Sequence, residues 1–175
     1  MASDHSPEAK AWWDAYQRQV RAFWQENPIP PSRRSDHLIA EFQRAAAAGD
    51  SDRIDLLVDV ALWPEVSPGL DALHRLLALP GHRRHQQIVR SLQLAADPDS
   101  LPFLRRAFDE DLQVMQDGSC SSFGAIAKWF SHAFADIGTP DAIAALRHYA
   151  LSHPEPEVRE EMRYRLDRLS LQPGN

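Results

Sequence analysis

The chain has 175 residues, of which 43% are apolar and 25% charged, and this length suits one folded domain with a continuous core. Its formal net charge of −6 argues against a protein that wraps a nucleic-acid backbone, where clustered cations supply most of the affinity. The acidic balance instead favours a basic partner. The single cysteine, Cys120, excludes an internal disulfide, and the absence of a secretory signal or a long apolar run leads us to expect a cytoplasmic protein that contacts no membrane.

The first expected element is a helix over residues 6–26. Ser6 followed by Pro7 is typical of an N-cap with proline in the first turn. Aromatic and apolar side chains then recur at helical spacing and form a broad stripe, at Trp12, Trp13, Tyr16, Val20, Phe23 and Trp24. Two interpretations stay open: the stripe packs as the first cap of the core, or part of it anchors a partner.

A helix-start pattern then occurs three times, at residues 49–61, 96–108 and 138–150. The three copies align Asp52, Asp99 and Asp141, at separations of 47 and 42 residues. Such a period is typical of stacked helical hairpins, because one hairpin cannot bury its apolar stripe alone. The pattern therefore predicts a single all-α domain over residues 1–175, a right-handed α-solenoid of about eight or nine helices. Its parts after the first helix are repeat units at 35–62, 67–117 and 123–152 and a capping helix at 155–170.

Several helix ends have recognisable residues. We expect Gly49 to end one helix and Asp50 to cap the next. A further helix is expected from Ser67 or Pro68 to Leu79, and two starts, Asp97 and Ser100, are possible for the one that contains Pro102. Glycine and serine dominate residues 116–124 and predict a loop there, which a partner could contact.

Asp136-Ile-Gly-Thr-Pro-Asp-Ala-Ile-Ala-Ala-Leu-Arg and, later, Pro156-Glu-Val-Arg resemble the bacterial HEAT-like repeats of the phycobilisome-lyase type. The resemblance covers roughly residues 84–170, is thinner over 35–62 and does not reach the aromatic first helix. It implies an armadillo-like fold but no particular activity, since the family includes scaffolds, inhibitors, lyases and a few enzymes. The chain lacks the His-Glu dipeptides of the iron-binding members and the basic surface of the members that act on DNA.

We expect no catalytic residue, cofactor or metal ion. The pairs His82 with His85 and His148 with His153 lack the i, i+4 spacing of a zinc helix, so we interpret them as surface histidines. His74, His132 and His148 lie on helices beside apolar residues and are expected to be hydrogen-bonded at the edge of the core. The stretch from Asp117 to Ser122 lacks the strand and glycine spacing of a nucleophile elbow.

The second helix of each hairpin usually lines the concave side of such a stack, where partners bind. The charged residues expected on that side, and therefore the predicted partner-binding residues, are Asp55, Asp59, Arg105, Arg106, Asp109, Glu110, Arg147 and His148. The alternative is that they form an ordinary solvated helix surface.

Together these features predict a non-catalytic protein-binding module. Its most concrete form is a cytosolic inhibitor or immunity-type protein that neutralises a basic protein toxin without binding nucleic acid. Two alternatives remain: a scaffold subunit that holds two partners, or a lyase or other enzyme that uses the concave groove. The sequence does not specify the oligomeric state.

Overall fold

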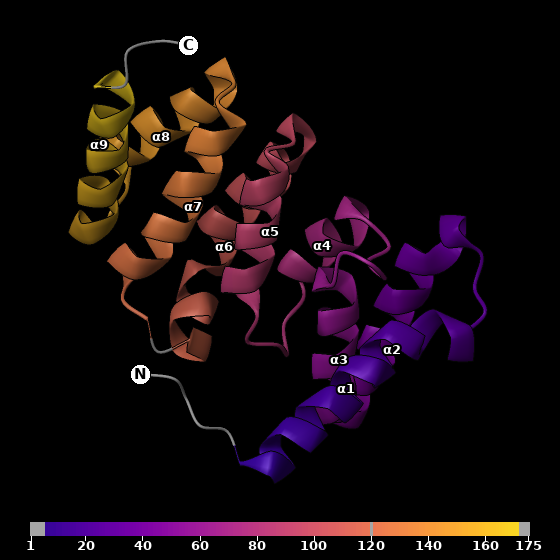
Figure 1. Cartoon of the computed structure of the whole chain (residues 1–175). Coiled ribbons are helices and arrows are strands. Elements are labelled where there is room, and N and C mark those ends of the chain that lie inside the picture. The colour runs from indigo at the N-terminus through magenta and orange to yellow at the C-terminus, as the bar shows by residue number, and fades with distance from the viewer. Residues whose placement is uncertain (1–5, 120, 172–175) are drawn as a thin grey trace. The chain divides into compact units, whose positions relative to one another are not determined.

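The structure is a computed structural model that describes residues 6–119 and 121–171. These residues form nine α-helices and two short 3-10 helices and contain no strand (Figure 1). The prediction of an all-α fold with eight or nine helices is therefore confirmed. No helix in the described ranges is both long and apolar enough to span a membrane. The α-helices are α1 (Pro7–Glu26), α2 (Arg34–Ala48), α3 (Ser51–Leu62), α4 (Leu70–Leu77), α5 (His85–Ala95), α6 (Leu101–Ser119), α7 (Phe123–Ile137), α8 (Pro140–Ser152) and α9 (Pro156–Ser170).

The helices form two compact units, residues 1–72 and residues 73–175, and the boundary falls inside α4. Each unit has its own set of fully buried side chains, for example Phe23 and Phe42 in the first and Phe108 and Phe130 in the second. The arrangement of all the hairpins in one continuous stack stays a prediction.

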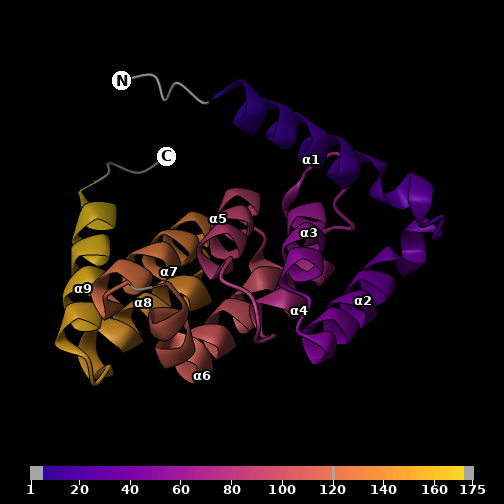
Figure 2. The same ribbon diagram turned by 90° about the horizontal axis from the view of Figure 1, so that it is seen from below.

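In the first unit, α2 and α3 lie side by side (Figures 1 and 2), and α1 packs on α3. Gly49 joins α2 to α3 in the left-handed conformation, with φ of 69°, and the Asp50 side chain caps α3 by accepting from the Arg53 N–H. The expected C-cap at Gly49 and N-cap at Asp50 are both present, because each depends only on local backbone chemistry. Ser6 likewise caps α1, accepting from the Ala9 N–H, with Pro7 in the first turn.

The aromatic stripe of α1 divides into a buried and an exposed half. Phe23 and Trp24 are buried, and the Trp24 indole N–H donates to the Val66 carbonyl at 2.6 Å. Trp12 and Trp13 remain 64% and 45% exposed, and both rings lie against Tyr16. Only the C-terminal half of the stripe therefore belongs to the core of this unit.

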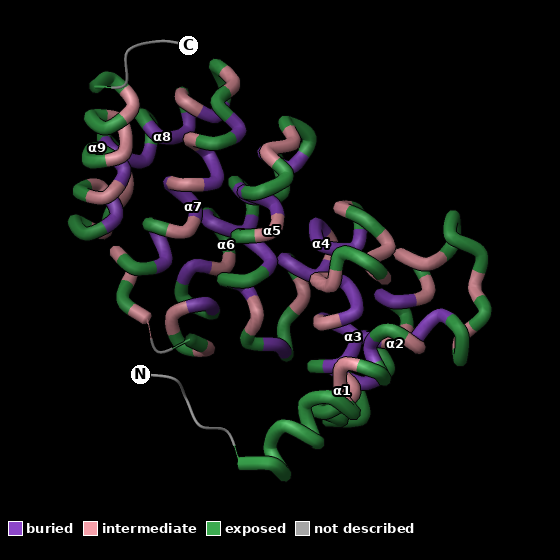
Figure 3. Tube along the Cα trace, in the orientation of Figure 1, coloured by how far each residue is buried: buried purple, intermediate pink, exposed green. Residues whose placement is uncertain are grey.

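In the second unit, α7 is the central helix, because it packs on α5, α6, α8 and α9. Buried segments recur along it (Figure 3), and they include Phe130 and Phe134. Their rings surround Phe108 of α6, which lies 4.9 Å from Phe130 between ring centroids and 4.8 Å from Tyr149. These four rings form the aromatic centre of the unit.

Two predicted helix starts differ from the structure. The helix expected from Ser67 or Pro68 to Leu79 instead begins at Leu70 and ends at Leu77. It begins later than expected because Gly69 has φ of 107°, which a helix cannot contain. The two starts left open for the helix containing Pro102 are each partly correct. Asp97 caps a short 3-10 helix, Pro98–Ser100, and α6 then begins at Leu101.

The prediction of a loop over residues 116–124 is wrong. Helix α6 continues to Ser119, whose hydroxyl donates to the Met115 carbonyl at 2.6 Å, and α7 already begins at Phe123. Ser122 caps α7, so only residues 121 and 122 are described as non-helical there. Serine therefore satisfies helix ends in this segment instead of breaking the helices. Cys120 lies outside the described residues.

The turn after α5 contains an alanine, Ala96, in a left-handed conformation. Ala96 has φ of 48°, a left-handed conformation that glycine adopts more easily. Ala96→Gly is expected to raise the free energy of unfolding by about 0.5 to 1 kcal/mol in urea denaturation. The matched variant, Gly138→Ala at φ of 65°, should lower it by about 1 kcal/mol. Changes of equal sign in the two variants would contradict this interpretation.

Candidate functional site

Five of the predicted partner-binding residues lie together in the second unit. They line an open groove of about 720 Å³ whose walls come from α6 and α8, which we call the α6–α8 groove. Its lining residues are Leu101, Pro102, Arg105, Arg106, Asp109, Glu110, Asp141, Ala144, Ala145 and His148. The groove thus combines charged side chains from two helices with an apolar surface between them.

Each wall of the groove follows from helical spacing. On α8, Asp141, Ala144, Ala145 and His148 recur at i, i+3, i+4 and i+7, which places them on one face. On α6, the charged residues fall in two adjacent pairs, 105–106 and 109–110, one turn apart. Thr139 fixes the start of α8 by accepting from the Ala142 N–H. Local helical spacing therefore determines which residues share a face of each helix. How closely α6 and α8 approach one another depends on how both pack on the core.

Hydrogen bonds position two of the groove carboxylates. The buried Tyr149 hydroxyl donates to Asp109 Oδ1 at 2.8 Å, and Arg106 Nε donates to Glu110 Oε2 at 2.9 Å. Burial, followed by the bond to Asp109, raises the pKa of Tyr149, so its hydroxyl keeps its proton at neutral pH. The hydrogen bond to Glu110 also raises the pKa of Arg106. Asp109 is thus tied to the core, while the Arg106–Glu110 pair lies on the exposed rim.

The remaining predicted residues lie elsewhere. Arg147 is exposed on α8 but does not line the groove. Asp55 and Asp59 belong to the first unit, on α3. Asp55 is exposed, whereas Asp59 is half-buried and accepts from the Tyr16 hydroxyl at 2.7 Å. The Asp59 carboxylate therefore also connects α1 with α3.

Sequence reasoning missed Asp141 and the apolar floor of the groove. The sequence pattern identified Asp141 only as an aligned repeat position, and it assigned no partner-binding role to Leu101, Ala144 or Ala145. The signal was nevertheless present, since Asp141 lies seven residues before His148 and so shares its helix face.

The interpretation of His82 and His85 as surface histidines is wrong, because they are only 6% and 7% exposed. Their rings stack with centroids 4.3 Å apart. His82 Nε2 contacts the Leu76 carbonyl at 2.9 Å, and its Nδ1 accepts from the Arg84 N–H. Burial, and then the charge of His82, lower the pKa of His85 to about 4. Both rings are therefore packing elements of the second unit.

Of the three histidines expected at the edge of the core, His74 meets the expectation, whereas His148 is exposed. His74 is buried, its Nε2 lies 2.8 Å from the Ser100 hydroxyl, and its ring stacks on Phe103. In the described part of the chain, no group of three or more His, Cys, Asp or Glu side chains is arranged to hold a metal ion.

A serine, a histidine and a glutamate meet where α7 packs on α9, but their hydrogen bonds differ from those of a catalytic triad. The Ser131 hydroxyl donates to Glu161 at 2.8 Å, and Ser131 is fully buried. His132 Nε2 lies 2.6 Å from an Arg165 nitrogen, which can only donate. His132 therefore directs a lone pair at Arg165 rather than at the serine, and the cluster as it stands holds the two helices together.

Residues 136–147, which the sequence analysis compared with a HEAT-like repeat, span the end of α7, the left-handed Gly138 and the first two turns of α8. Its Gly-Thr-Pro-Asp sequence supplies a C-cap, an N-cap, a first-turn proline and a first-turn acid, in that order. These roles explain the local pattern without assigning a function. Comparison of the chain with models of known protein families, with curated proteins and with solved structures finds no match.

Proposed function

We propose that this chain is a non-catalytic protein-binding module of the inhibitor or immunity type, which binds and neutralises a basic protein. The observation that carries the proposal is the α6–α8 groove, where charged residues from two helices surround an apolar floor. Protein interfaces combine a desolvated apolar centre with a polar rim in this way. The groove contains both signs of charge, which suits recognition of a protein surface by complementary pairs.

Preorganisation of the groove supports the same proposal. Asp109 is held by a bond from the buried Tyr149, so little of its side-chain freedom remains to be lost on binding. Leu101 and Ala145 at the floor are buried, whereas Pro102 and Ala144 are exposed and available for contact. A partner that covers this floor would desolvate the charges around it and strengthen their interactions.

The distribution of charge supports a basic partner. Residues 1–72 contain twelve acidic and seven basic side chains, whereas residues 73–175 contain thirteen and twelve. The acidic excess is thus concentrated in the first unit, where α3 exposes Asp52 and Asp55. A negative potential of this kind speeds the encounter with a cationic protein and makes it sensitive to salt.

Stacking of hairpins in a right-handed, HEAT-like solenoid is part of the proposal. The contacts within the second unit support it, because α5 packs on α7 and α7 packs on α9. Alternate helices therefore neighbour one another, as they do when hairpins stack side by side.

The proposal is tested by isolating the partner and titrating the purified proteins. We expect a complex with one copy of each chain, measured by light scattering after size exclusion. Glu110→Arg combined with Asp141→Arg should weaken binding at least tenfold in calorimetry, since it places two cations in the groove that repel a basic partner. The matched control, Glu160→Arg with Asp167→Arg at exposed positions of α9, makes the same change in charge and should change the dissociation constant by less than about twofold.

Three results would contradict the proposal. Equal losses in the groove and control variants would show that only net charge matters. A larger assembly with two different partners would instead support a scaffold. Turnover of a small molecule that depends on the groove residues would indicate an enzyme.

A further inference from the structure

A second groove lies on a different face of the second unit, between α5 and α7, and we call it the α5–α7 groove. Its larger hollow, about 450 Å³, is lined by Gln86, Arg90, Gln93, Lys128, Trp129 and His132. A smaller hollow of about 260 Å³ shares Gln86 and Trp129 and adds Arg83, Ser119 and Ser121 among its lining residues. The larger hollow has the size of an ordinary small-molecule site, and the smaller one extends it.

The charge of this groove differs from that of the whole chain. Arg83, Arg90 and Lys128 line it, and no carboxylate from the described residues does. None of these three cations forms an ion pair within residues 6–119 and 121–171. Arg90 instead donates to the Gln93 side chain at 2.8 Å, and Gln93 in turn donates to Asp136 at 2.5 Å. Although the net charge of the chain is −6, this groove presents three cations that form no ion pair with any described residue.

His132 adds a hydrogen-bond donor to the same surface. Because the Arg165 guanidinium donates to its Nε2, the neutral ring carries its proton on Nδ1. Burial is the first cause that lowers the pKa of His132, followed by the positive charge of Arg165. The charge of Lys128 also lowers the pKa of His132, whereas the charges of Asp136 and Glu161 raise it. An anion bound beside this ring would raise its pKa.

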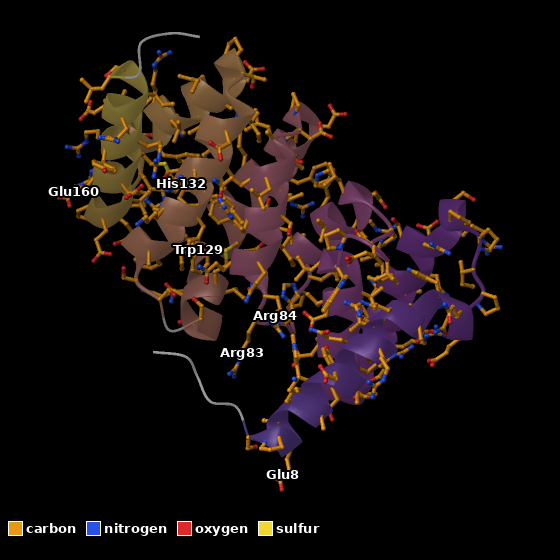
Figure 4. The ribbon with its side chains drawn as sticks, viewed as in Figure 1. Glu8, Arg83, Arg84, Trp129, His132 and Glu160 are labelled. Atoms are coloured by element: carbon orange, nitrogen blue, oxygen red, sulfur yellow. The ribbon has the colours of Figure 1, made fainter. Side chains whose placement is uncertain are left out.

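Trp129 supplies an aromatic surface at the junction of the two hollows. It is half-buried and lines both of them, and among the described residues no other aromatic ring stacks on it. Figure 4 shows Trp129 and His132 along α7, with Arg83 and Arg84 in the segment that precedes α5. Planar rings bind well to an indole face with one open side.

We propose that the α5–α7 groove binds a nucleoside phosphate. Arg90 and Lys128 contact the phosphate, and the base lies against Trp129. Gln86, Ser119 and Ser121 offer amide and hydroxyl groups to the sugar and the base edge. The site holds a free nucleotide and not a nucleic-acid strand, because the chain as a whole would repel an extended polyanion. This site is separate from the α6–α8 groove and does not depend on the function proposed for it.

The test is calorimetric titration of the full chain with ADP at low and physiological salt. We expect saturable binding of one ADP per chain. Arg90→Ala and Lys128→Ala should each weaken it at least tenfold, and Trp129→Ala should do the same. Trp129→Phe keeps an aromatic face, so it should bind ADP within threefold of the parent chain. Binding retained in this variant would show that the loss in Trp129→Ala comes from lost stacking and not from misfolding. The matched control is Arg163→Ala on α9, which should leave ADP binding unchanged.

Two further measurements complete the test: the binding of fragments of ADP and the pKa of His132. Adenosine and inorganic phosphate should each bind at least tenfold more weakly than ADP, and the pKa of His132, followed by NMR, should rise when ADP binds. The proposal is overturned if ADP does not bind at millimolar concentration, or if inorganic phosphate binds as tightly as ADP. Binding of a single-stranded oligonucleotide in preference to ADP would also overturn it.

Discussion

Replacing Phe108 with alanine is expected to lower the free energy of unfolding by about 3 to 5 kcal/mol, the usual cost of a large core truncation. Phe108 is 1% exposed, and its ring lies within 4.9 Å of Phe130 and 4.8 Å of Tyr149 between centroids. Phe134 and His153 complete the surrounding cluster. The alanine variant loses the transfer free energy of the ring and leaves a cavity that α7 and α8 close only in part.

Urea denaturation followed by circular dichroism measures this loss. The control is Leu151→Ala on α8, a side chain that is 82% exposed and should change the free energy of unfolding by less than about 0.5 kcal/mol. A loss below about 1 kcal/mol in Phe108→Ala would contradict the aromatic centre described for the second unit.

The free energy of unfolding is expected to depend on pH through His85. Its pKa is about 4 in the folded chain, compared with about 6.5 in an unfolded one. Between these two values the unfolded state binds more protons, so the free energy of unfolding decreases as the pH falls. The contribution is complete above pH 6.5 and is lost progressively down to about pH 4. Its size is at most about 3 kcal/mol.

The variant His85→Gln removes the titrating group while keeping a polar side chain. Between pH 7 and pH 4 its stability should fall by roughly 2 to 3 kcal/mol less than that of the parent chain, whatever its stability at pH 7. The control Gln87→Ala changes an exposed, uncharged side chain of the same helix and should keep the parental slope. Equal slopes for the parent and His85→Gln would show that His85 titrates normally in the folded state.

The parts of the fold that were predictable from sequence are those fixed by local chemistry. Gly49, Asp50 and Thr139 determine helix ends through their own backbone or side-chain bonds, so their roles follow from residue type alone. Ala96 shows the limit of that reasoning. It takes the left-handed conformation that glycine normally supplies, and nothing in the residue types around Ala96 indicates this conformation.

Residues 116–124 were misinterpreted for a related reason. Glycine and serine weaken a helix locally, but α6 continues to Ser119 because Leu112 and Met115 are buried in the core of the second unit. The burial of His82 and His85 has the same origin, since tertiary packing places two polar rings inside. Composition alone cannot predict either result.

The α6–α8 groove was partly predictable because each of its walls is one face of one helix. The charged residues at 105–106 and 109–110, and His148, were identified from their helices alone. The α5–α7 groove was not identified at all, because Arg90 and Lys128 are distant in sequence and approach only when α5 packs on α7. Sites of that kind require the tertiary structure.

The proposed protein-binding function can be decided by hydrogen exchange of the chain alone and in complex with its purified partner. We expect amide protection on binding to increase in α6 and α8, at the segments that line the α6–α8 groove. Protection confined to α5 and α7, or no change in α6 and α8 when the complex forms, would contradict it.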